Sequence, residues 1–211
     1  MDPWILISIT FLELLFLIIP TYIAKTIETN SLKEQFIDLG FTKSDDSIPN
    51  IGAKIILGFI LGIFFFLIGG YILYFFTIVV VSNLFGADFL VDAQKGAIST
   101  QPLQPNILQL FILIMQQIFI IAVCEEFFFR AFLIEKISYK LNVIHAMIIS
   151  SLFFAIYHVP PFLVPLSTII TYFGYYFFFA LLLGTLYIVL NQSLLSVIVA
   201  HSTFNILVIL L

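Results

Sequence analysis

Three motifs of polar residues interrupt the otherwise apolar second half of this sequence. In chain order they are Glu125-Glu126-x-x-x-Arg130, Phe154-x-x-x-His158 and His201-x-x-x-Asn205. Carboxylates and imidazoles are the side chains that most often transfer protons in catalysis, and amide and imidazole N–H groups can hold a developing oxyanion. The residue types therefore indicate a hydrolytic site.

The spacing of the first motif separates its two carboxylates. Glu126 and Arg130 are four residues apart, so they are neighbours on one face of a helix, and we expect them to pair and to brace the site. Glu125 points about 100° away from Glu126 around the helix, which leaves it available for chemistry. His201 and Asn205 are also one turn apart and face the same direction.

Four residues are therefore candidates for catalysis: Glu125, His158, His201 and Asn205. If their helices converge on an internal cavity, these side chains could position and activate a water molecule. Glu125 and His158 would accept its proton, while His201 and Asn205 would donate to an acyl oxyanion. No Ser or Cys nucleophile stands at a suggestive spacing from a base, which favours direct attack by water over an acyl-enzyme.

The composition shows what kind of protein positions these residues. Of 211 residues, 62% are hydrophobic, 9% are charged and 26 are Phe, whereas soluble domains carry roughly 25% charged residues. This excludes a soluble enzyme, a disordered tail, a coiled coil and a disulfide scaffold. With eight Lys and Arg and a net charge of −4, the chain has no basic patch for nucleic acid. The single cysteine, Cys124, is expected to serve packing.

The predicted fold is all-α and multispanning, with about six transmembrane helices around a polar intramembrane cavity. A helix needs about 20 apolar residues to cross a bilayer, and three of the six apolar runs are shorter than that. The runs cover residues 4–24, 51–85, 107–123, 144–159, 166–190 and 194–211. We expect one integral membrane domain over residues 1–211. Residues 1–106 would supply two N-terminal helices and loops, and residues 107–211 the motif-bearing catalytic core.

Two connecting segments carry expectations of their own. Residues 86–104 are mostly polar and predict a connection between spans. Residues 131–141 alternate apolar and charged side chains, which predicts an amphipathic helix at the membrane interface. That placement puts Glu125 only about 8 Å deep, against about 20 Å for His158. The two residues can meet only if helices tilt or the third span continues past Arg130.

The distribution of lysines predicts the orientation. If six helices alternate, most lysines fall on one side of the membrane and Lys95 falls on the other. The first group contains Lys25, Lys33, Lys43, Lys54, Lys136 and Lys140. Basic residues favour the cytoplasmic side, so we expect both termini outside and a site that is accessible from the cytoplasm.

The three motifs, in this order and each within its own span, resemble those of the CPBP intramembrane peptidases. This family includes CAAX-processing proteases of the Ras-converting type and the bacterial Abi, or bacteriocin-processing, proteins. The resemblance covers residues 107–211. It implies an intramembrane endopeptidase that cleaves near the terminus of a peptide or protein substrate, which can be lipidated. It also implies that Glu125 and His158 activate water, that His201 and Asn205 stabilise the oxyanion, and that Glu126 and Arg130 brace the site.

Three alternatives stay open. A divalent metal such as zinc would use Glu125, His158 and His201 as ligands, although the absence of HExxH favours a metal-free reaction. A transporter would use the same buried Glu and His residues as a proton relay, but the sequence has no internal repeat. A non-catalytic immunity or scaffold protein would keep the polar groups without using them.

Four further residues in the spans lie outside the catalytic set. Phe154 is expected to support the site by packing, and Gln116 and Gln117 to form hydrogen bonds between helices. Glu13 lies in the middle of the first run with no evident partner within its own span. It is either a protonated, packed carboxyl group or a group that lines the cavity.

Overall fold

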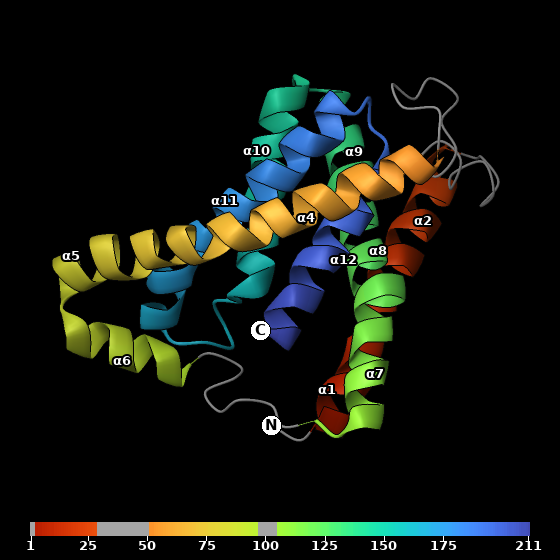
Figure 1. The fold of residues 1–211 in the computed structure, drawn as a ribbon. Helices are drawn as coiled ribbons and strands as arrows, with labels where there is room; N and C mark the ends of the chain where they lie inside the picture. Colours follow the sequence, from red (N-terminus) through yellow and green to blue (C-terminus); the bar gives the residue numbers. More distant parts are fainter. Residues whose placement is uncertain (1–2, 29–50, 97–104) are drawn as a thin grey trace.

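A computed structural model describes residues 3–28, 51–96 and 105–211, and within these ranges the chain forms helices and no strand (Figure 1). The helices are α1 (Pro3–Thr10), α2 (Leu15–Glu28), α4 (Ile51–Tyr74), α5 (Asn83–Phe85), α6 (Ala87–Lys95), α7 (Ile107–Gln116), α8 (Ala122–Glu126), α9 (Glu135–Ser138), α10 (Val143–His158), α11 (Leu166–Val189) and α12 (Leu194–Leu210). The predicted all-α fold is confirmed.

Irregular turns join several of these helices into longer ones. A 3₁₀ turn, Phe11–Leu14, links α1 to α2, and π-helical turns cover Phe75–Ser82, Gln117–Ile121 and Phe127–Ile134. In the described ranges, four helices are long and apolar enough to cross a membrane, namely Pro3–Thr26, Ile51–Phe85, Ile107–Ser138 and Leu166–Val189. The apolar helices α10 and α12 are shorter. The chain is therefore a multispanning membrane protein.

The expected interfacial helix over residues 131–141 is wrong. The third span continues without a break from Ile107 to Ser138, and Ala131 and Ile134 are buried in the core. At 1.5 Å per residue, Glu125 lies about 20 Å from the end of its helix at Ser138, and His158 lies about 22 Å from the start of α10 at Val143. The mismatch in depth disappears because the span continues past Arg130.

The connection over residues 86–104 also contains more structure than expected. Its first half forms α6, which packs against α11. Ser167 of α11 donates a hydrogen bond to the Asp92 carboxylate at 2.8 Å, and Thr168 donates to the carbonyl of Ala93 at 2.8 Å. The polar residues that suggested a loop therefore anchor a short helix to the fifth span.

Close packing of α4 on α12 fixes the helix that carries His201 and Asn205 (Figure 1). A Cβ atom added at Gly58 would lie 2.6 Å from the carbonyl oxygen of Ser196. One added at Gly62 would lie 2.5 Å from the Cβ atom of Thr203. Two glycines one turn apart thus let the backbones approach, as small residues do between membrane helices.

A β-branched residue at Gly62 is expected to push α12 away from α4. We expect Gly62→Val to lower the stability by about 1–3 kcal/mol, the usual effect of overpacking. The measurement is the melting temperature of the purified protein in detergent. Gly70→Val on the same helix is the control, because nothing lies within 4 Å of a Cβ atom there. Equal melting temperatures for the two variants would contradict the close approach.

Sequence signals at the helix ends agree with the structure. The Asn142 side chain accepts a hydrogen bond from the His145 backbone N–H at 2.9 Å and caps α10. The helix ends at His158, two residues before Pro160, because proline cannot continue it. Asn191 and Gln192, with φ values of 52° and 63°, form the tight turn between α11 and α12. His158 is therefore the last residue of its helix.

Candidate active site

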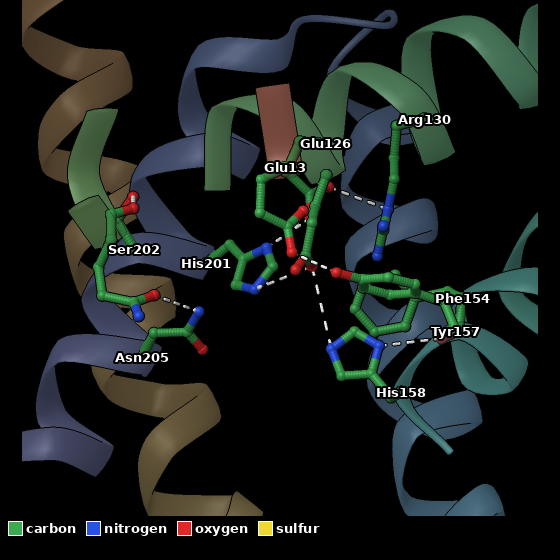
Figure 2. Close-up of polar contacts among 11 residues, drawn as sticks. Glu13, Glu126, Arg130, Phe154, Tyr157, His158, His201, Ser202 and Asn205 are labelled. Carbon is green, nitrogen blue, oxygen red and sulfur yellow. Dashed lines mark hydrogen bonds and ion pairs between the residues drawn. The ribbon is translucent and has the colours of Figure 1, made fainter. Parts of the chain in front are cut away.

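Glu126 connects two other charged or polar groups at the centre of the site (Figure 2). Its Oε2 lies 2.9 Å from Arg130 Nε, and its Oε1 lies 2.6 Å from His201 Nδ1. Glu126 and Arg130 are 0% and 1% exposed. The expected Glu126–Arg130 pair is present, and Glu126 also orients the His201 ring, which turns Nε2 away from the pair.

Glu125 faces the two imidazoles. Its Oε2 lies 3.8 Å from His201 Nε2 and 4.0 Å from His158 Nε2. This oxygen is buried and has no hydrogen-bond partner among the described residues. The separations are too long for direct hydrogen bonds, but one water molecule about 2.8 Å from each atom would fit between them. A single water molecule could therefore bridge Glu125 to the two imidazoles.

The His158 ring is held on both faces and at one nitrogen. Its Nδ1 lies 2.9 Å from the carbonyl oxygen of Phe154, to which Nδ1–H can donate. The ring stacks on Phe154 at 4.2 Å between centroids and contacts Tyr176 at 4.5 Å. Arg130 lies 4.6 Å from the centroid of the Phe154 ring. Donation from Nδ1 leaves the lone pair of neutral His158 on Nε2, toward Glu125.

Asn205 is oriented by the third span. Its Nδ2 donates to the side-chain oxygen of Gln117 at 2.9 Å, and Ser202 donates to the Gln117 carbonyl at 3.2 Å. One of the two amide hydrogens on Nδ2 is used in this bond, so the other is available to a ligand. Gln116 donates to the carbonyl of Ile7 at 2.9 Å. Both glutamines therefore bond between helices, as expected.

A small cavity opens beside these groups. Its volume is about 50 Å³, in a measure by which one water molecule needs roughly 10–15 Å³. His158, His201 and Asn205 form its polar side. Its other walls are apolar or aromatic and come from Phe65, Phe154, Tyr175, Tyr176, Phe179, Leu183 and Phe204. The cavity can hold a few waters or a small apolar group next to the polar cluster.

Residues 107–207 match the family described as Type II CAAX prenyl endopeptidase Rce1-like. Because of this similarity we call residues 107–207 the Rce1-like domain. Searches of curated proteins and of solved structures found no match to the chain. The expected resemblance to CAAX-processing proteases is thereby confirmed. The Rce1-like domain contains all four catalytic candidates.

The structure brings together most of the residues that the sequence singled out. Glu125 faces His158 and His201. The two histidines and Asn205, which lies one turn from His201, line the cavity of the Rce1-like domain. Sequence reasoning missed the contact between Glu126 and His201, because only the packing of α8 on α12 creates it. It also left out Glu13, although a carboxyl group in the middle of a span was a signal in itself.

The zinc alternative stays a prediction. The described residues contain no group of three or more His, Cys, Asp or Glu side chains placed to hold a metal ion. Zinc binds oxygen and nitrogen at about 2.0–2.2 Å, so Glu125, His158 and His201 would have to move closer together to share an ion. Their present separations suit a hydrogen-bonded water better.

The bond from Asn205 to Gln117 gives a first prediction for the Rce1-like domain. Gln117→Leu removes the acceptor that orients the Asn205 amide, and we expect kcat for peptide cleavage to fall by up to about tenfold, the effect of one hydrogen bond. Gln117→Glu keeps an acceptor oxygen and should retain more activity. Steady-state kinetics in detergent measures both variants. A Gln117→Leu enzyme as active as the wild type would show that this bond does not matter.

Proposed function

We propose that this chain is an intramembrane endopeptidase in which Glu125 and His158 activate a water molecule for attack on a peptide carbonyl. The observation that supports this most strongly is the approach of Glu125 Oε2 to the Nε2 atoms of both histidines, at 3.8 and 4.0 Å. In this proposal, residues 1–211 act as one domain, because the N-terminal helices pack directly on the Rce1-like segment.

The reaction would proceed in two steps. The water oxygen bonds to the carbonyl carbon while its proton passes to Glu125 or His158, and the carbonyl oxygen becomes an oxyanion. His201, protonated at both nitrogens, and Asn205 donate to that oxyanion. The intermediate then collapses, the C–N bond breaks and the stored proton passes to the leaving amine. Glu126 balances the charge of His201 through its hydrogen bond at 2.6 Å.

The lining of the cavity favours a substrate that is apolar next to the cleaved bond. Aromatic walls surround the polar side of the cavity, so the residue beside the cleaved bond would be apolar. We propose that cleavage takes place near the terminus of a peptide or protein, and that a lipid attached there stays in the surrounding bilayer. A substrate with and without a farnesyl group distinguishes a requirement for the lipid from a preference for apolar residues.

We propose that the substrate enters from the cytoplasmic side. The end of α2, the start of α4 and α9 lie at the same end of the bundle in Figure 1, and these elements carry Lys25, Lys54 and Lys136. Lys95 lies at the end of α6, away from them. Lys33, Lys43 and Lys140 complete the expected basic side, and the first two lie outside the described residues. Basic residues favour the cytoplasm.

The test is cleavage by the purified protein in liposomes. Peptides ending in a Cys-aliphatic-aliphatic-X sequence, with and without a farnesyl group, are incubated with the protein, and the products are identified by mass spectrometry. We expect a single internal cleavage near the C-terminus. Intact peptides under all conditions would contradict the proposal.

Two further measurements in the same liposomes distinguish the metal-dependent, proton-relay and scaffold alternatives. Activity that survives exhaustive chelation supports water activated by Glu125 and His158 alone, whereas activity lost with EDTA and restored by Zn²⁺ would favour the metal-dependent version. Proton flux into the same liposomes, without cleavage, would favour the proton relay. Folded protein with neither activity would favour the immunity or scaffold role.

A further inference from the structure

Glu13 reaches the site from a part of the chain outside the Rce1-like segment. It lies in the 3₁₀ turn between α1 and α2, and its side chain lies among the catalytic candidates in Figure 2. It interacts electrostatically with Glu125 and with His201. The first span therefore contributes a carboxyl group directly beside the proposed catalytic groups.

The partner of Glu13 is Tyr157, which precedes His158 in α10. The Tyr157 hydroxyl donates a hydrogen bond to Glu13 Oε1. The Tyr157 ring meets the His158 ring edge to face, with 5.2 Å between centroids and an angle of 89°. The hydrogen bond thus holds an aromatic ring that lies directly against a proposed catalytic imidazole.

Phe16 strengthens the same contact. It lies three residues after Glu13, on the same side of the helix. Its ring meets the Tyr157 ring edge to face at 4.9 Å and stacks on Phe128 of the third span at 4.8 Å. Glu13 and Phe16 together bind Tyr157 through one polar and one aromatic contact. Burying a carboxyl group within a span is costly. The contact with Tyr157 gives the Glu13 carboxyl group a role that can offset this cost.

We propose that Glu13 is a positioning residue of the active site, which holds Tyr157 by a hydrogen bond and through that ring fixes the His158 imidazole. The inference rests on the proposed peptidase function for its kinetic readout. It means that the first span completes the site, so the Rce1-like segment needs residues that precede it. The role requires a hydrogen-bond acceptor at position 13, not a charge.

The kinetic test compares substitutions on the two sides of the hydrogen bond. Glu13→Leu and Tyr157→Phe should each lower kcat by about threefold to tenfold, and the double variant should lose no more than either one. Glu13→Gln keeps an acceptor oxygen and should stay close to wild type. Thr21→Val is the matched control, because this buried hydroxyl donates to the Leu17 carbonyl of its own helix. Additive losses in the double variant would overturn the proposal.

A second readout does not depend on activity. Diethyl pyrocarbonate modifies histidines, and peptide mapping resolves His158 from His145 and His201. We expect faster modification of His158 in Glu13→Leu and Tyr157→Phe, at an unchanged rate for His145, while Glu13→Gln and Thr21→Val match the wild type. If Glu13→Leu matched the wild type in this rate, the positioning role would be wrong, even in an active protease. An inactive wild type with the expected labelling would overturn the peptidase function alone.

Discussion

Glu125→Gln is expected to lower the rate of peptide cleavage by about 10²–10⁴-fold, the usual contribution of a general base. The substitution keeps the volume of the side chain and removes only its ability to accept a proton. Oε2 of Glu125 has no hydrogen-bond partner among the described residues. The substitution therefore breaks no hydrogen bond to this oxygen. We therefore expect the variant to melt at or above the wild-type temperature.

The measurement is initial cleavage rate in liposomes together with thermal melting in detergent. His158→Ala should also abolish cleavage, since Nε2 of His158 faces Glu125 Oε2. Glu135→Gln is the matched control on the same span, where the carboxylate lies 3.7 Å from Lys136 and away from the cavity. Normal cleavage by both Glu125→Gln and His158→Ala would remove these residues from the mechanism.

Arg130→Met has the largest expected effect on stability. Arg130 and Glu126 are almost fully buried and lie 2.9 Å apart. Removing one member of a buried ion pair leaves the other charge uncompensated, which costs about 3–5 kcal/mol. We therefore expect the melting temperature to fall sharply. Arg130→Met should also lower activity, because Glu126 holds His201.

A double variant separates the loss of charge balance from the loss of packing. In Glu126→Gln/Arg130→Met both members of the buried ion pair lose their charge, so we expect part of the stability lost in Arg130→Met to return. Activity should stay low, because Gln at position 126 does not carry the charge that balances protonated His201. A double variant less stable than Arg130→Met would show that packing on Phe154, and not the ion pair, determines stability.

The sequence predicted those features that depend on local spacing. Apolar runs located the helices because each run must cross the same apolar layer, and Pro160 marked the end of α10. The spacing of Glu126 and Arg130 predicted their pairing, because residues four apart always meet on a helix. The spans from Ile144 and Leu166 began within one residue of the observed helices α10 and α11.

Features that depend on how helices pack were not predictable in the same way. The charged residues of 131–141 suggested an interfacial helix, but Ile134 packs in the core and the span continues. The contact between Glu13 and Tyr157 joins residues 144 positions apart. Gly58 and Gly62 did carry a usable signal, because small residues at this spacing are typical of close contact between membrane helices.

The central claim is that one water molecule lies among Glu125, His158 and His201 and attacks the substrate. An experimental structure at a resolution that shows ordered water, with the protein in lipid, tests this most directly. We predict a water within about 3.2 Å of Glu125 Oε2 and of the Nε2 atoms of both histidines. A structure in which Glu125 points into lipid, or in which the three atoms lie too far apart to share a water, would contradict the account.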